Sequence, residues 1–160
     1  MRFWKSSLIS AKRLWGLSRS ERRILFLALP LLPLTAWALA LFGFRRVYVS
    51  LDRALCATRP PVSRDSGAER LRAQAMGSLV RSAARRSPVP VRCLPIAVVV
   101  WVLLRIERLP AALHLGVRTS DHAFEAHAWV ECGGTVLDDS QGTWCPLPPL
   151  PSAASTGLQR

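Results

Sequence analysis

An uncharged, largely apolar run from residue 24 to residue 44 dominates the first third of the chain. Just ahead of it, Ser18 and Glu21 have capping-box spacing, in which each residue satisfies a backbone N–H of the other. A basic segment precedes the run, and Arg45 and Arg46 follow it. We therefore predict a long apolar helix with positive charge at both ends.

Two interpretations of this helix are open. Its 21 residues are enough to cross a bilayer core, and the basic residues ahead of it would hold the N-terminus inside the cell. Pro30 and Pro33 within the run argue against spanning, as do the arginines at both ends. Spanning would also place the remaining chain outside the cytosol. A helix packed against the domain, or lying in the membrane interface, avoids this conflict.

The next segments are predicted to be a linker and a second helix. Residues 57–67 contain prolines, serines and a glycine without an apolar period, which is typical of a linker. Residues 68–86 have the apolar spacing of a helix. The residues expected on its buried face are Leu71, Ala75, Leu79 and Ala83.

A third helix is predicted to begin at a cysteine. Cys93-Leu94-Pro95 opens an apolar segment that continues to Leu104. Because proline fits the first turn of a helix, Cys93 should lie at or just before the helix N-terminus. The segment is apolar on all sides, which predicts a helix buried in the middle of the fold.

After Pro110 the pattern changes to short strands. Residues 112–117 and 126–131 are expected to be strands, and Gly133 and Gly134 fit a hairpin turn from which residues 136–137 return. The sequence thus predicts an α+β fold: a helix that carries cysteine, then an antiparallel meander that carries histidine and aspartate.

This order divides the chain into three parts. Residues 1–56 form a basic segment and the apolar helix, residues 68–142 form the core, and residues 143–160 form an irregular tail rich in Pro and Ser.

The net charge and the cysteines limit the partners, the metal sites and the compartment that we expect. The formal net charge of +12 favours anionic partners such as lipid head groups, nucleic acid or an acidic peptide, and its sign alone does not choose among them. The four cysteines have no metal-site spacing, so we expect no metal. Because no cleavage site of a signal peptide follows the apolar run, the expected compartment is the cytoplasm, with the inner face of the membrane as an alternative.

Three residues have the right types for a thiol-based triad. A helix N-terminus and a nearby imidazolium both favour a thiolate, and Cys93 and His127 can supply this pair. Asp138 and Asp139 follow the hairpin, so either can reach His127 and hold its orientation. Judged from the residues alone, Cys93 and His127 are also compatible with ordinary core positions.

Several segments of the same region form a recognisable set: Cys93-Leu94-Pro95 with the apolar helix after it, Leu109-Pro110-Ala111, Leu115-Gly116-Val117, Phe124, Ala126-His127-Ala128-Trp129-Val130-Glu131 and Gly134. With these segments the chain resembles the lasso-peptide leader peptidases, which are transglutaminase-like (papain-like) cysteine proteases. The resemblance is strongest over residues 93–139 and weaker upstream.

The resemblance implies a function and a site. Cys93 would be the nucleophile, His127 the base and Asp139 the orienting acid, with Asp138 as the adjacent alternative. The enzyme would remove the leader from a ribosomally made lasso-peptide precursor without a cofactor. Its partners would be a separate leader-recognition protein and a ring-forming cyclase. The family often has glycine at position 108, in a left-handed turn, where Arg108 costs roughly 1 kcal/mol.

Other functions compete with this one. The same thioester permits acyl transfer to an amine, and a membrane-associated binding protein with a modified or vestigial triad is another candidate. A nucleic-acid binder is disfavoured, because no recognition motif is present and aromatic residues are not interleaved with the basic run. We therefore expect no nucleic-acid partner.

Overall fold

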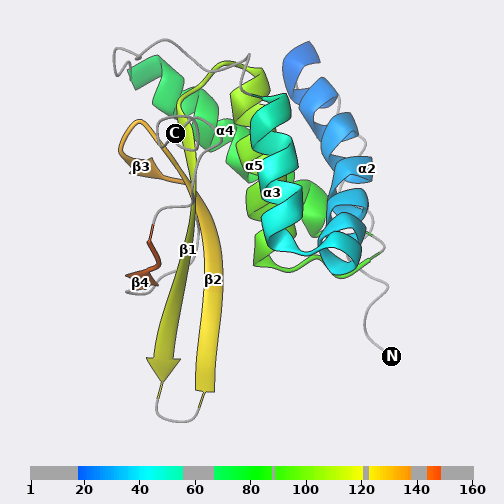
Figure 1. The fold of residues 1–160 in the computed structure, drawn as a ribbon. Coiled ribbons are helices and arrows are strands. Elements are labelled where there is room, and N and C mark those ends of the chain that lie inside the picture. The colour runs from blue at the N-terminus through cyan, green and yellow to red at the C-terminus, as the bar shows by residue number, and fades with distance from the viewer. Residues whose placement is uncertain (1–17, 56–66, 88, 121–122, 138–143, 149–160) are drawn as a thin grey trace, which may run out of the picture.

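The computed structural model describes residues 18–55, 67–87, 89–120, 123–137 and 144–148. Within these residues, four helices precede a four-stranded antiparallel sheet (Figure 1). The helices are α2 (Arg19–Phe42), α3 (Phe44–Ala54), α4 (Gly67–Ala84) and α5 (Cys93–Ile106). The strands are β1 (Ala111–Ser120), β2 (Ala123–Cys132), β3 (Thr135–Val136) and β4 (Cys145–Pro146), in the sheet order β3-β2-β1-β4. The predicted α+β class is confirmed.

Helix α2 begins with the predicted capping box. The Ser18 hydroxyl accepts a hydrogen bond from the Glu21 backbone N–H (3.2 Å), and the Glu21 carboxylate accepts one from the Ser18 backbone N–H (2.7 Å). Hydrogen bonds from the Ser18 hydroxyl and backbone hold the pKa of Glu21 below its usual value, because they stabilise the charged form. At the other end α2 stops at Phe42, because Gly43 has a φ of +76°, and α3 begins at the next residue.

One side of α2 is packed against the domain. Helix α2 contacts α4 and α5, and Leu25, Ala28 and Leu32 are buried there. Its segment Glu21–Phe42 is nevertheless long and apolar enough to cross a membrane, with a mean hydropathy of 2.2. A core helix and a signal sequence share these properties, so length and composition alone assign no compartment.

The buried face of α4 differs from the predicted one. Leu71 and Ala75 are exposed, whereas the buried residues are Ala73, Met76, Gly77, Val80 and Ala83. Only Ala83 belongs to both sets. Alanine and glycine are small, so they let neighbouring segments approach the helix closely. A prediction based on large apolar side chains does not identify them as buried positions. The predicted linker, residues 57–67, lies outside the described residues except for Gly67, which begins α4.

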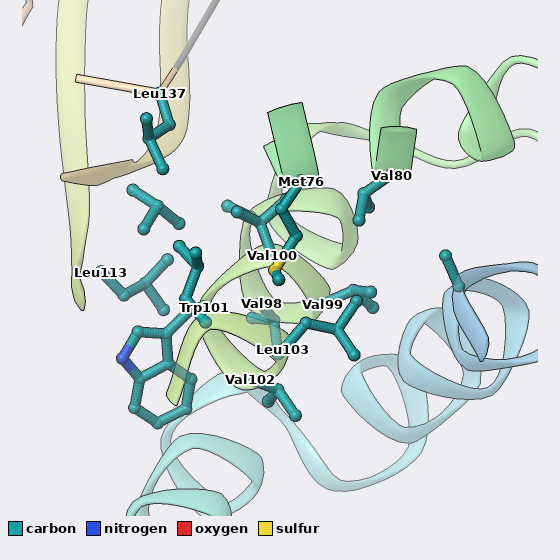
Figure 2. Packing of buried hydrophobic residues seen from close by; sticks show 14 of the residues in the cluster. Met76, Val80, Val98, Val99, Val100, Trp101, Val102, Leu103, Leu113 and Leu137 are labelled. Carbon is teal, nitrogen blue, oxygen red and sulfur yellow. The ribbon is translucent and has the colours of Figure 1, made fainter. Parts of the chain in front are cut away.

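Helix α5 is the centre of the fold, as predicted. Pro95 and every residue from Ala97 to Leu104 are buried (Figure 2). Trp101 stacks on Tyr48 of α3 with ring centroids 5.2 Å apart. Burial raises the pKa of Tyr48, since it disfavours the charged phenolate, and Asp52 adds to this. After α5 the chain turns at Arg108, whose φ of +59° is the left-handed conformation that the resemblance implied.

The sheet is built on the long β1–β2 hairpin, which extends away from the helices (Figure 1). Gly133 and Gly134 form the predicted turn with positive φ angles of 55° and 72°, and Cys132 pairs with Thr135 across it. Leu137 then donates its backbone N–H to the Val130 carbonyl (2.8 Å).

The prediction that the tail is irregular from residue 143 was wrong for Cys145 and Pro146. Cys145 and Pro146 form β4, which pairs with Val117 and Gly116 of β1. The Leu147 backbone N–H also donates to the Leu115 carbonyl (2.8 Å). Proline is tolerated in this position because β4 is an edge strand. The remaining tail from residue 149 lies outside the described residues.

Candidate active site

Cys93 is the first residue of α5, at the N-terminus of the buried central helix. Arg92 before it has extended backbone (φ −84°, ψ 176°) and makes no side-chain capping hydrogen bond. The first backbone N–H groups of a helix have no intrahelical acceptor, and they carry partial positive charge. The half-buried thiol therefore lies where a negative charge is favoured.

The thiol faces β2. Cys93 Sγ lies 4.0 Å from the carbonyl oxygen of Ala126, the residue before His127. Cys93 and His127 also line one cavity of about 240 Å³ between α5 and β2. The other lining residues are Arg81, Ile96, Ala97, Val100, Ala128, Trp129, Val130 and Leu137. Two of the three predicted site residues thus line one mostly apolar cavity, while the His127 ring itself stacks on Trp129 and Trp144.

The third predicted residue is not placed. Asp139 and its alternative Asp138 lie outside the described residues. The described chain ends just before them at Leu137, which is buried and lines the cavity. The choice between the two carboxylates stays open.

His127 belongs to a stack of rings on the face of the hairpin opposite α5. Side chains alternate along a strand, so Leu113, Ala128, Val130 and Cys132 form a buried core face. The opposite face, called the ring face here, carries His114, Gly116, Arg118, Glu125, His127 and Trp129. The His127 ring stacks on Trp144 (centroids 4.9 Å apart) and, at 6.2 Å, on Trp129. Trp129 in turn stacks on His114 (5.8 Å).

Two residues that the sequence did not single out hold this stack in place. Gly116 is paired with His127 across the hairpin, and the Trp129 ring lies over it. A Cβ at position 116 would be 2.8 Å from two Trp129 ring carbons and 3.0 Å from the Cys145 carbonyl oxygen. Arg118 places its guanidinium 4.5 Å from the centroid of Trp144 and forms an ion pair with Glu125. Trp144 thus contacts both His127 and Arg118.

Arg81 of α4 is a further residue that sequence reasoning missed. Its guanidinium donates a 2.6 Å hydrogen bond to the carbonyl of Leu137, and it lines the cavity with Cys93 and His127. Leu137 is therefore held at both backbone groups, immediately before the two candidate carboxylates. No motif signalled this contact, because 56 residues separate the partners along the chain.

The other described thiols differ from Cys93. Cys132 is buried on the core face, and burial, followed by the charge of Glu69, raises its pKa, so it stays protonated near neutral pH. Cys145 is exposed on β4. Neither one lines the cavity.

Comparison with known families agrees with this architecture. The model of the transglutaminase-like superfamily matches residues 38–150, well over half of the chain. The chain belongs to the transglutaminase-like superfamily. The predicted transglutaminase-like fold with an N-terminal apolar helix is therefore confirmed. No curated protein and no solved structure gave a significant match.

Superfamily membership is compatible with both cysteine peptidase and acyl-transfer chemistry, and it does not decide between them. The catalytic assignments of Cys93, His127 and Asp139 stay predictions.

Proposed function

We propose that this protein is a cysteine peptidase that removes the leader from a lasso-peptide precursor. The observation that carries the proposal is the cavity that Cys93 and His127 share in a transglutaminase-like domain. The position of Cys93 at the N-terminus of α5 adds support, since the first backbone N–H groups of a helix can stabilise an oxyanion formed there. The lasso-peptide assignment rests on the residues around Cys93 and His127 that resemble the leader peptidases.

In this proposal Cys93 Sγ attacks the carbonyl carbon of the scissile peptide bond. The C–N bond then breaks, His127 delivers a proton to the leaving amine, and a thioester remains on Cys93. Water, deprotonated by His127, hydrolyses the thioester and frees the thiol. Asp139 would hold the imidazole in the productive orientation, with Asp138 as the alternative. The backbone N–H of Cys93 is suited to stabilise the oxyanion.

The substrate would reach this site with the help of partners. A separate leader-recognition protein would present the precursor, and a cyclase would accept the trimmed peptide. We expect weak cleavage by the isolated chain, so robust cleavage without the recognition protein would contradict this part.

The first test is mass spectrometry of the precursor after incubation with this protein and its leader-recognition partner. We expect one leader-sized cut with the wild type and a loss of rate on the order of 10³-fold or more with Cys93→Ala or His127→Ala. Asp139→Asn should reduce the rate more than Asp138→Asn. Adding an amine nucleophile distinguishes hydrolysis from acyl transfer, because transfer adds the mass of the amine to the product.

Matched controls are available on the same sheet. Cys145→Ala removes an exposed thiol and His114→Ala removes another ring-face imidazole, and both should cleave nearly as fast as the wild type. If the folded wild type leaves a precursor uncut while the partner is bound, the peptidase proposal fails. The alternative of a binding protein with a vestigial triad is then favoured.

A further inference from the structure

The outer side of α2 is an exposed apolar surface. Phe26 and Trp37 are 68% and 70% exposed, and Leu34 and Leu41 are as open as Phe26. These residues recur at helical spacing on the side opposite Leu25, Ala28 and Leu32. Large exposed apolar patches on a folded domain mark interaction sites. Figure 1 shows α2 at the edge of the molecule, on the far side of the helices from the β1–β2 hairpin.

The inner side of α2 restricts how that surface can be used. Ala28 and Leu32 are fully buried against the domain, whose central helix α5 begins with Cys93. A helix that crossed a bilayer would have to leave these contacts. An apolar surface on a helix that stays docked can enter only the interfacial layer of a membrane, with the helix axis parallel to the membrane plane.

Arginines stand at both ends of the apolar surface. Arg22 and Arg23 are exposed at the start of α2. Beyond its end, Arg45, Arg46 and Arg53 line a broad hollow of about 940 Å³ along α3, together with Phe42 and Phe44 among others. The acidic residue of α3, Asp52, is buried and lies 3.9 Å from Arg105 of α5, so its charge is directed away from this surface. This pattern complements an anionic lipid surface.

We propose that the outer face of α2, with the arginine-lined hollow of α3, docks the protein on a bilayer that contains anionic lipids. Phe26, Leu34, Trp37 and Leu41 enter the interface, while the arginines contact the head groups. The domain stays folded and the cavity stays outside the hydrocarbon. The inference stands on the α2–α3 surface alone, so it is independent of the proposed peptidase activity.

The test is co-sedimentation of the full chain with vesicles of phosphatidylcholine, with and without phosphatidylglycerol. We expect strong binding only to the anionic vesicles, and weaker binding at high salt because the charges are screened. The double variant Phe26→Glu/Trp37→Glu should reduce partitioning at least about tenfold. Arg45→Gln/Arg46→Gln should reduce it by roughly fivefold for each arginine removed.

Control variants carry the same chemical changes elsewhere. Leu71→Glu/Phe124→Glu replaces two equally exposed apolar residues on α4 and β2, and Arg85→Gln/Arg86→Gln removes two exposed charges at the end of α4. Both controls should bind like the wild type, and circular dichroism checks that all variants fold. Equal loss in variants and controls would overturn the assignment to α2.

Three other outcomes would also overturn it. Failure of the wild type to bind either vesicle would show that this surface is not a membrane-docking site. Equal binding to neutral vesicles would remove the role of the arginines. Resistance to extraction by alkaline carbonate would show that α2 spans the bilayer rather than lying on it.

Discussion

The two faces of the β1–β2 hairpin share one backbone, but one face packs in the hydrophobic core and the other carries candidate site residues. The core face contributes Leu113, Ala128 and Val130 to the packing against α5 and is buried. The ring face carries His127 and Trp129, which are half-buried and stack on each other, and His127 also stacks on Trp144. Strand alternation therefore places stability and candidate chemistry on adjacent residues, and substitutions one position apart should have different consequences.

The largest effect is expected on the core face. Val130→Asp would bury a carboxylate at a position only 2% exposed, which costs several kcal/mol and should abolish cooperative unfolding. Phe124→Asp is the matched control, since Phe124 lies on the same strand and on the same side but is 72% exposed. Chemical denaturation followed by circular dichroism measures both. A cooperative transition of normal midpoint for Val130→Asp would show that this face is not the core.

A middle-sized effect is expected where the ring face is most crowded. Gly116→Ala places a methyl group 2.8 Å from the Trp129 ring, so the ring must move, and we expect a loss of about 1–3 kcal/mol in the free energy of unfolding. Gly67→Ala is the control, because a Cβ there meets nothing within 4 Å.

A double-mutant cycle sharpens this prediction. In a Trp129→Ala background, Gly116→Ala should cost less, since the ring that it displaces is gone. Equal cost in both backgrounds would mean that the Cys145 carbonyl, and not Trp129, sets the limit at this position.

The smallest effect on stability is expected at the edge of the stack. Trp144→Ala removes one stacking partner of His127 and should lower the free energy of unfolding by only about 1 kcal/mol. If His127 is the catalytic base, its loss of position should slow precursor cleavage by up to about 100-fold. Denaturation and cleavage measured on the same sample give the two numbers. A loss of rate no greater than the loss of folded protein would show that Trp144 contributes to packing and does not position His127.

Local chemistry explains the parts of the fold that could be predicted. Ser18 and Glu21 cap their own helix, Gly133 and Gly134 can adopt positive φ, and the run after Cys93 is apolar on every side. Each of these features depends on residues close together in the chain. The helix-start cysteine and the strand histidine followed from the same local patterns and from the resemblance.

The wrong predictions concern segments whose burial or strand pairing depends on distant parts of the chain. The buried side of α4 is covered by α2 and α5 and, at Gly77, by Leu137, and it contains Ala73 and Gly77 instead of Leu71. Cys145 and Pro146 of the tail form a strand because the edge of β1 is free to pair with them. Neither result can be read from apolar periodicity, since each depends on what packs against the segment.

The amino-acid sequence was thus sufficient for helices α2, α4 and α5, for the β1 and β2 strands with the Gly133–Gly134 turn, for the burial of the central helix and for the residue types of a thiol site. The tertiary structure decided which side of each element is covered, that Cys93, His127 and Arg81 line one cavity, and that Trp144 stacks on His127. The physical reason is the range of the interactions. Caps, turns and helical periods are set within a few residues, whereas the contact of Arg81 with Leu137 exists only after α4, α5 and the sheet have packed together.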